Sequence, residues 1–240
     1  MKFLKWNNIR LILMFALVVF LYSFTSNRNS HRKLKKSEVI FVGDNNNFVK
    51  QESVNKLLIE NSSDVKTIEK SDLNLDKLEN SINKHPMVEK SEVFVSVDGV
   101  LKAVVKQKTP IARVFSEDGS FYIDYEGNRM PLSDISTARV PLISGVIDNK
   151  NKKKLSEVLK MIYNDEFLKK NIIGVQVLPD ASLMMTNRNY DFKIEFGKMM
   201  NEEKKFKNYK AFFQKAVSDT MLNNYKKINL RFTHQVVCTK

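Results

Sequence analysis

The chain has few of the residues that build catalytic and metal centres. Its single cysteine, Cys238, excludes an intramolecular disulfide, so the folded parts depend on packing alone. Its three histidines are His31, His85 and His234, and none has a second metal ligand at the usual spacing. Only 7 of the 240 residues are glycine, and the sequence contains neither a glycine-rich phosphate loop nor a G-x-S-x-G motif. These absences predict a protein without a catalytic, cofactor-binding or metal-binding site.

Two residue pairs are the remaining candidates for chemistry. Cys238 and His234 would lie on one face of a regular strand, but a cysteine in a β-rich run is expected to pack rather than to react. Asp124 and Glu126 stand two apart beside a turn, which favours a solvated hairpin over an acid–base pair. The alternative function is a secreted or membrane-anchored enzyme or ligand-binding protein of unknown substrate. It predicts a deep pocket lined by several polar groups with shifted pKa values.

Positive charge dominates the composition. The formal net charge is +13, but the lysines are scattered along the chain, which is typical of a solvated surface. Nucleic-acid binding favours clustered arginine and lysine with exposed aromatic residues, so we expect no nucleic-acid partner. The basic segment Arg28 to Lys36 has two interpretations. It either contacts anionic lipid headgroups or acidic partners, or it is a solvated spacer.

One long apolar run, Leu11 to Phe24, stands near the N-terminus. The uncharged stretch continues to Asn27 and spans about 25 Å as a helix, which suffices for one membrane crossing. A cleavable secretory signal would need small residues after the run, whereas Tyr22 and Phe24 are bulky. The sequence therefore predicts a transmembrane helix over residues 11–27 that is retained as an anchor.

The signals for membrane orientation disagree. More basic residues follow the apolar run than precede it, so the positive-inside rule favours an internal location for the large remainder. A short N-terminal tail ahead of a long folding domain favours the opposite topology. We predict that residues 1–10 are a cytoplasmic tail, that residues 28–36 are a linker, and that the rest is exported.

A first folded unit is predicted over residues 37–108. A β-rich run at residues 38–42 begins it, and the run is followed by polar residues Asn45–Asn47 that suit a helix cap. The helix expected after this cap carries an apolar stripe of Val54, Leu57 and Leu58.

The second half of this unit contains a helix and a hairpin. The helix is predicted to begin near Asn74 and to stop at His85-Pro86. Apolar residues then alternate over Val93–Val97 and again over Leu101–Val105, on either side of Asp98-Gly99, a two-residue turn typical of tight hairpins. The predicted order is strand, helix, helix, strand, strand.

A larger unit is predicted over residues 109–240, after a boundary at Lys108-Thr109-Pro110. Pro131 and Pro141 bracket a loop that is predicted to end at Gly145. The predicted strands are residues 111–115, 121–124, 173–178, 182–186, 191–196, 227–232 and 235–238. Two helices carry the buried stripes Leu155, Val158, Leu159 and Ile162, and, after Asn201, Phe206, Tyr209, Phe213 and Val217. The chain is therefore predicted to be α+β, with a mixed α/β second domain on a mainly antiparallel sheet.

The order of these segments resembles the bacterial cell-division family FtsQ, also called DivIB. Besides the anchor and the strand–helix–helix–strand–strand unit, the similar segments are Val105–Ala112 (VKQKTPIA), Phe121–Gly127 (FYIDYEG), Pro141–Gly145 (PLISG) and Ile228–Val237 (INLRFTHQVV). The ordered set covers nearly the whole chain, whereas no single motif is specific. Gln107 and Lys108 stand where the family has Glu and Arg, and Asn229 replaces the Asp of the family's I-D-L-R-[YF] strand.

The resemblance implies a polypeptide-transport-associated (POTRA) domain followed by a larger β domain, without enzymatic activity or a cofactor. It implies a bitopic scaffold of the divisome in the cytoplasmic (inner) membrane, with its C-terminal domains outside the cytoplasm, in the periplasm, and enriched at the division site. The implied partners are proteins resembling FtsB and FtsL at the far domain, and FtsK-like and other division proteins at the POTRA domain. POTRA domains also occur in outer-membrane assembly factors, but those chains usually carry several copies or a barrel, and this sequence shows neither.

The resemblance places partner binding at the C-terminal strand, where an FtsB-like chain adds a strand and the aromatic residue closing L-R-[YF] contributes. That residue is Phe232, preceded by Arg231. A strand at a free sheet edge offers backbone groups to another chain, so the hypothesis expects residues 228–232 at an edge. Arginine and aromatic residues often dominate interface energy. The alternative is that Phe232 lies in the core and Arg231 is merely solvated. The predicted partner-binding residues are Asn229, Leu230, Arg231, Phe232, Gln235, Val236 and Val237.

Overall fold

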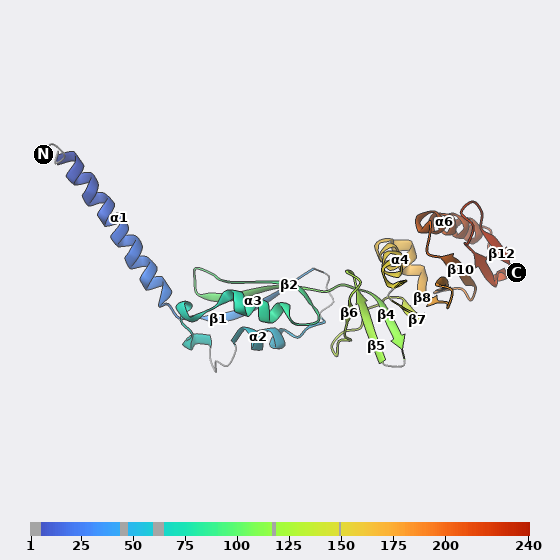
Figure 1. Ribbon diagram of the computed structural model, residues 1–240, viewed down its shortest axis with the longest axis horizontal. Coiled ribbons are helices and arrows are strands. Elements are labelled where there is room, and N and C mark those ends of the chain that lie inside the picture. Colours follow the sequence, from blue (N-terminus) through green and yellow to red (C-terminus); the bar gives the residue numbers. More distant parts are fainter. Residues whose placement is uncertain (1–5, 44–47, 60–64, 117–118, 149) are drawn as a thin grey trace. The chain divides into compact units, whose positions relative to one another are not determined.

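The computed structural model describes residues 6–43, 48–59, 65–116, 119–148 and 150–240 (Figure 1). The chain divides into two compact units. The first contains the N-terminal helix and a three-stranded sheet, and the second contains a nine-stranded sheet. The predicted helix cap at Asn45–Asn47 lies outside the described residues.

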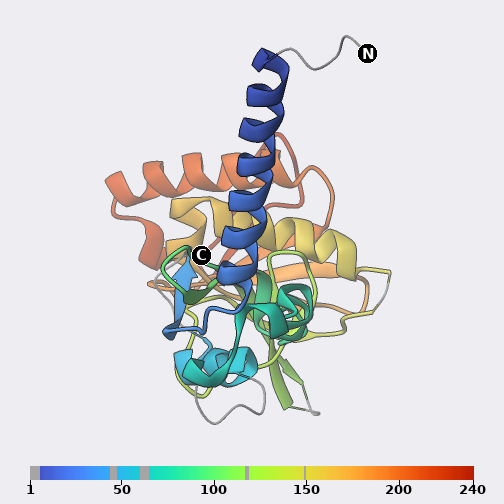
Figure 2. The same cartoon turned by 90° about the vertical axis from the view of Figure 1, so that its left-hand side faces the viewer.

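Helix α1, Trp6–Ser30, runs without interruption (Figure 2). Its residues from Asn8 to Ser30 are long and apolar enough to cross a membrane. The apolar side chains of this stretch are exposed, since no other described part of the chain covers them. Both observations fit the predicted single-pass anchor.

The first unit has the predicted order of strands and helices. Strand β1 (Lys36–Val42) pairs in parallel with β3 (Val100–Gln107), and β3 pairs antiparallel with β2 (Val88–Val95), so β3 is central. Asn74 caps α3 as expected, because its side chain accepts a hydrogen bond from the Lys77 N–H at 2.9 Å. The remaining elements are α2 (Gln51–Ile59), α3 (Leu75–Asn83) and the short 3₁₀ helices η1 (Val65–Thr67) and η2 (Lys70–Asp72).

The β2–β3 hairpin is confirmed, but its connection is longer than predicted. The strands end at Val95 and resume at Val100, so residues 96–99 form the turn in place of Asp98-Gly99 alone. The Gly99 N–H donates to the Ser96 carbonyl at 3.0 Å, and Gly99 adopts a φ of 87°, which favours glycine. The Ser96 hydroxyl adds a hydrogen bond from the Val100 N–H, and this local bond extends the turn.

The second unit is built on one sheet with the order β12-β11-β10-β9-β8-β7-β4-β5-β6. Neighbouring strands are mostly antiparallel, and the pairs β4–β7, β7–β8 and β10–β11 are parallel. This confirms the expected mixed domain with a mainly antiparallel sheet. The strands are β4 (Pro110–Ser116), β5 (Gly119–Asp124), β6 (Arg129–Met130), β7 (Leu142–Gly145), β8 (Ile172–Val177), β9 (Ser182–Asn187), β10 (Lys193–Lys198), β11 (Lys227–Asn229) and β12 (Val237–Thr239).

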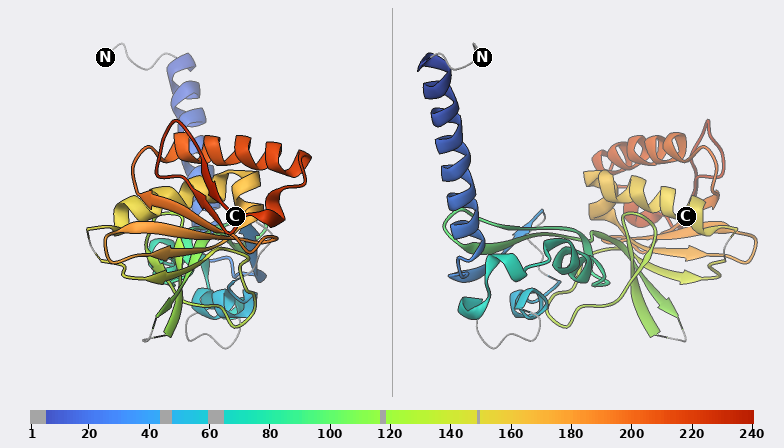
Figure 3. Two further views of the ribbon diagram at one scale, coloured as in Figure 1. Left: turned by 90° about the vertical axis from the view of Figure 1, so that its right-hand side faces the viewer. Right: turned by 60° about the vertical axis from the view of Figure 1, so that its left-hand side comes forward.

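Helices α4 (Lys152–Asn164) and α6 (Glu202–Ser218) lie on one face of this sheet (Figure 3). Their predicted apolar stripes are buried against the sheet, except that Val217 is 46% exposed in the last turn of α6. The short helix α5 (Glu166–Asn171) was not predicted. Asp165 caps α5 by accepting from the Leu168 N–H at 3.0 Å, and Leu222–Asn224 forms the 3₁₀ helix η3.

The prediction of a loop that ends at Gly145 is wrong in part. Residues 142–145 form β7, which lies inside the sheet between β4 and β8. Only Ile143 of this strand is buried, so the strand lacks the alternation that identifies longer strands.

Candidate partner-binding edge of the nine-stranded sheet

The edge of the nine-stranded sheet is formed by β12 and not by the strand before it. Ile228 in β11 lies opposite Ile194 of β10 on one side and opposite Cys238 of β12 on the other. The expectation that residues 228–232 form a free edge is therefore wrong, because the chain folds back and lays its next strand outside β11. Among the described strands, β12 has only β11 as a neighbour, so its outer backbone groups face away from the sheet.

Residues 230–232 leave the sheet after β11. The Leu230 N–H still donates to the Glu195 carbonyl at 2.8 Å, and the Leu230 side chain is buried. The next N–H, of Arg231, instead donates to the side chain of Asn229 at 2.9 Å, which bends the backbone away from β10. A β-bulge in β10 places Gly197 beneath this bend, where a Cβ would lie 2.8 Å from the Arg231 Cγ. Gly197 thus provides the space for the arginine side chain.

Glu195 is the acidic group beneath this bend. Its side chain is only 14% exposed and pairs with the Lys227 Nζ at 2.9 Å and the Arg231 Nε at 3.9 Å. The Arg231 side chain stays 55% exposed, so the long ion pair orients it but contributes little stability. Most of the guanidinium remains accessible to another molecule.

Phe232 follows Arg231 in the β11–β12 connection and is 50% exposed. The alternative that Phe232 belongs to the core is therefore wrong. The next residue is fixed to the helix layer, because the Asn208 side chain on α6 donates to the Thr233 carbonyl at 2.9 Å. An exposed arginine and an exposed aromatic residue thus stand together in a connection held at both ends.

Comparison with family models matches both units. A POTRA-like domain matches residues 35–106, and the model described as FtsQ/DivIB, C-terminal related, matches residues 109–239, which is more than half of the chain. The chain belongs to the FtsQ/DivIB family. Membership gives it a role in cell division, and this family consists of non-enzymatic division proteins. A comparison with curated proteins gave no match.

The other predicted site residues of this FtsQ/DivIB chain lie on two sides of the backbone. Gln235 and Val237 are exposed, whereas Val236 is partly buried against the core, as is Cys238, which was not among the predicted site residues. Burial raises the pKa of the Cys238 thiol, which disfavours the reactive thiolate. Thr239 belongs to β12 and is also exposed, although the predicted strand stopped one residue earlier. The alternation of exposed Val237, partly buried Cys238 and exposed Thr239 is the pattern that could have extended the predicted strand to Thr239.

The described residues do not bring together a metal-binding group or a cysteine–histidine pair on one strand. His234 lies in the connection before β12 and not on a strand beside Cys238. No group of three His, Cys, Asp or Glu residues among those described could hold a metal ion.

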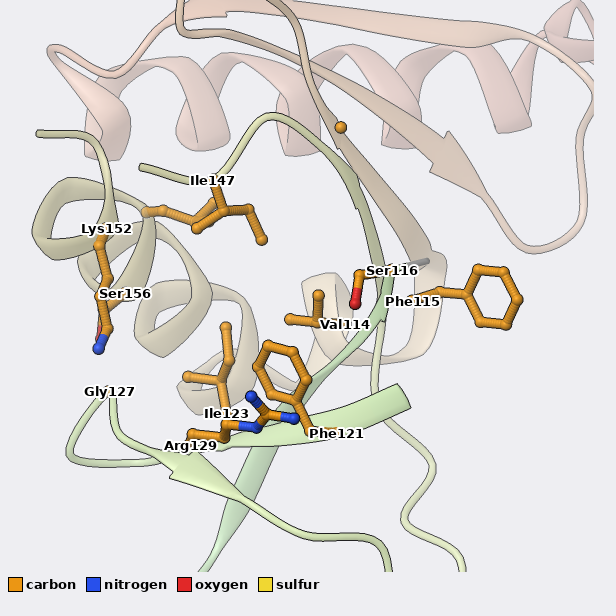
Figure 4. Close-up of a pocket in the computed structure, with 12 residues that line it drawn as sticks. Val114, Phe115, Ser116, Phe121, Ile123, Gly127, Arg129, Ile147, Lys152 and Ser156 are labelled. Carbon is orange, nitrogen blue, oxygen red and sulfur yellow. The ribbon is translucent and has the colours of Figure 1, made fainter. Parts of the chain in front are cut away.

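A groove of about 890 Å³ lies towards the other end of the sheet, between strands β4–β5 and the beginning of α4 (Figure 4). Its floor is apolar, and its charged groups are Arg129 and Lys152. The Arg129 guanidinium stacks 4.3 Å from the centre of the Phe121 ring. The described lining contains no carboxylate, histidine or cysteine, so this groove does not provide the polar constellation that an enzyme hypothesis predicts. Its apolar side chains are Val114, Phe115, Phe121, Ile123, Ile147 and Leu155.

Proposed function

We propose that this FtsQ/DivIB chain is a non-enzymatic bitopic scaffold of the bacterial divisome that binds a partner strand along β12. The partner is the extracytoplasmic part of an FtsB-like protein, which acts together with an FtsL-like protein. The observation that supports this proposal best is the position of β12 at the sheet edge, directly after an exposed Arg231–Phe232 pair.

Strand addition explains why the site uses backbone rather than reactive groups. An incoming strand bonds the outer N–H and C=O groups of β12, and these bonds supply affinity without regard to sequence. Selectivity comes from side chains beside the edge. Val237 is 41% exposed, and covering the exposed half of the Phe232 ring adds about 1 kcal/mol of hydrophobic free energy.

The proposed topology places residues 1–10 in the cytoplasm and both folded units in the periplasm, at the division septum. One apolar helix stands near the N-terminus, ahead of a large folded remainder, and this supports a single crossing of the inner membrane. In this arrangement the POTRA-like unit lies next to the bilayer, where it recruits FtsK-like and other division proteins. The second unit presents β12.

Site-specific photo-crosslinking tests the strand-addition site. The full chain, in nanodiscs, carries a photoreactive residue at Val237 or at Thr239 and is mixed with the purified extracytoplasmic domains of the FtsB- and FtsL-like proteins of the same bacterium. We expect crosslinks to one short segment of the FtsB-like chain. The mapped positions should shift by one residue along that segment for each residue moved along β12, as paired strands require.

Phe115 provides the matched control, since it is 72% exposed in β4, away from the proposed site. A photoreactive residue there should give no crosslink. Binding that persists while Val237 and Thr239 both fail to crosslink would overturn the β12 site. Normal septation in cells depleted of the chain would contradict the proposal that the chain is a division scaffold.

A further inference from the structure

Helix α1 is bonded directly to the first folded unit. The Lys70 N–H donates to the Arg32 carbonyl at 3.0 Å, and the Leu34 N–H donates to the Ile68 carbonyl at 3.0 Å. The Lys70 ammonium also reaches the Asn29 side chain, in the last turn of α1, at 3.4 Å. Residues 28–36 are therefore not the linker that the sequence suggests. They join the helix to the unit through paired backbone.

The β2–β3 connection lies at this same end of the unit. The Lys35 N–H donates to the Gly99 carbonyl at 2.8 Å, and the Lys70 Nζ lies 3.4 Å from the Ser96 carbonyl. Lys70 thus links the end of α1 to the hairpin tip. Val97, within this tip, is 88% exposed and is the most exposed large apolar side chain among the described residues.

Four exposed cations belong to the segment that forms this junction, and we call them the basic collar: Arg28, Arg32, Lys33 and Lys35. None of them forms an ion pair with a described residue. The segments bonded to it carry three carboxylates, Glu69, which bonds His31 at 3.1 Å, Asp72 and Asp98, and one further cation, Lys70. The junction therefore keeps a net positive charge.

The length of the apolar run fixes the height of the collar. The uncharged stretch from Leu11 to Asn27 spans about 25 Å, whereas the hydrocarbon layer is about 30 Å thick. A short span draws its flanking residues towards the bilayer, so Arg28 lies at the level of the headgroups. Helix α1 ends at Ser30, and the next residues are bonded to the folded unit. The other three collar residues therefore lie close to the depth of Arg28, near the headgroups.

We propose that this end of the POTRA-like unit rests on the bilayer surface, with the basic collar on anionic phospholipid headgroups and Val97 in the interfacial layer. Clustered cations beside an exposed apolar side chain are the combination that favours an anionic membrane surface. The anchor holds the collar among headgroups at all times, whereas an acidic protein would have to displace them. The contact sets the height and tilt of the first unit, and it does not depend on the β12 site.

A quenching measurement on the full chain tests this contact. Cys238 is replaced by serine, and Val97→Cys carries an environment-sensitive dye, in nanodiscs of phosphatidylcholine with or without phosphatidylglycerol. A lipid with a spin-labelled headgroup serves as the quencher. We expect strong quenching only with the anionic lipid, and its loss at about 0.5 M salt, where charges are screened within a few ångströms.

The variant Arg32→Gln/Lys33→Gln/Lys35→Gln keeps Arg28 and therefore the insertion of α1. Each removed charge should lower the docked-to-undocked ratio by about fivefold. The dye is the same in all samples, so its own affinity for the membrane does not affect the comparison between variants.

The control is Lys152→Gln/Lys153→Gln/Lys154→Gln, which changes the net charge equally at three exposed lysines of α4. It should quench like the parent. Equal quenching in both lipid mixtures, or quenching that survives in the collar variant, would overturn the proposal. A collar that binds an acidic protein instead would show no dependence on lipid charge and would overturn it too. Crosslinking at Val237 should stay unchanged in every variant, which separates this test from that of the partner site.

Discussion

Ile228 of β11 lies directly opposite Cys238 of β12, and its side chain is completely buried in the core of the second unit. This pairing divides the C-terminal segment into two kinds of residue. Ile228 and Leu230 hold the sheet to its helices, whereas Arg231, Phe232 and Val237 face outward. Substitutions in the first group should change folding, and those in the second should change binding.

Phe232→Ala and Arg231→Glu are each expected to weaken binding of the FtsB-like partner by about 1–2 kcal/mol, or roughly 5- to 30-fold in Kd. Both side chains are at least half exposed, so the free energy of unfolding should change by about 0.5 kcal/mol or less. Calorimetric titration and urea unfolding measure the two quantities. Unchanged binding in both variants would show that the partner does not contact Arg231 or Phe232.

Leu230→Ala is the matched contrast. Leu230 is 1% exposed, so its truncation should lower the free energy of unfolding by about 2–5 kcal/mol. The folded fraction should still bind the partner normally. A Leu230→Ala protein that is as stable as the parent would show that the Leu230 side chain does not pack in the core.

Local signals in the sequence predicted most elements correctly. Alternating apolar residues identified β2 and β3, Asn74 marked the beginning of α3, and the four-residue stripe from Leu155 identified α4. Each of these depends on neighbours in sequence, because periodicity and capping are local properties.

The misplaced features depend on contacts between distant residues. Nothing within residues 227–239 shows that β12 lies outside β11, because strand order is set by which surfaces meet in the folded sheet. Strand β7 has a single buried residue, Ile143, and is too short to show alternation. Val217 continues the α6 stripe in sequence, but it lies in the last turn of the helix and is 46% exposed.

Lys205 is a buried cation that gives a pH-dependent prediction. Its side chain is 2% exposed, and its Nζ donates to the carbonyls of Phe196 and Lys198 at 2.9 and 2.7 Å. Burial lowers the pKa of Lys205 below its ordinary value of 10.5, although Glu202 opposes the shift. Between the lowered pKa and 10.5, the unfolded chain binds more protons than the folded chain, so stability due to Lys205 rises with pH in this window.

The difference in unfolding free energy between the parent and Lys205→Met should therefore shift in favour of the parent as pH approaches 10.5. Below the lowered pKa the difference should be constant. Urea unfolding of both proteins over this range measures it. Lys204→Met, at an exposed position of the same helix, is the control and should show no such trend. Parallel curves for the parent and Lys205→Met would contradict the assignment.

Tyr209 and Asn187 form a buried hydrogen bond between α6 and β9. The Asn187 Nδ2 donates to the Tyr209 Oη at 3.0 Å, and both residues are at most 2% exposed. Tyr209→Phe leaves this donor without its acceptor, which should lower the free energy of unfolding by about 1–3 kcal/mol. Tyr225→Phe, at a partly buried tyrosine, should change it by about 0.5 kcal/mol or less. Equal losses in the two variants would mean that the Tyr209 hydroxyl contributes no specific bond.

Gly145 and Gly119 both have positive φ, 96° and 109°, but they differ in their surroundings. A Cβ at Gly145 would lie 2.0 Å from the Val177 carbonyl oxygen, whereas a Cβ at Gly119 would meet no atom within 4 Å. The backbone conformation alone penalises alanine by about 1–2 kcal/mol, and Gly119→Ala should show only this loss in urea unfolding.

Gly145→Ala adds a clash with backbone, which cannot rotate away as a side chain would. Strands β7 and β8 must then separate where Gly145 pairs with Val177, so the loss should exceed about 3 kcal/mol. Amide hydrogen exchange should locate the damage at β7 and β8 and leave the β2–β3 hairpin of the first unit protected. Equal destabilisation in the two alanine variants would mean that β7 can move away from β8 without loss, and that the sheet is not closely packed at its centre.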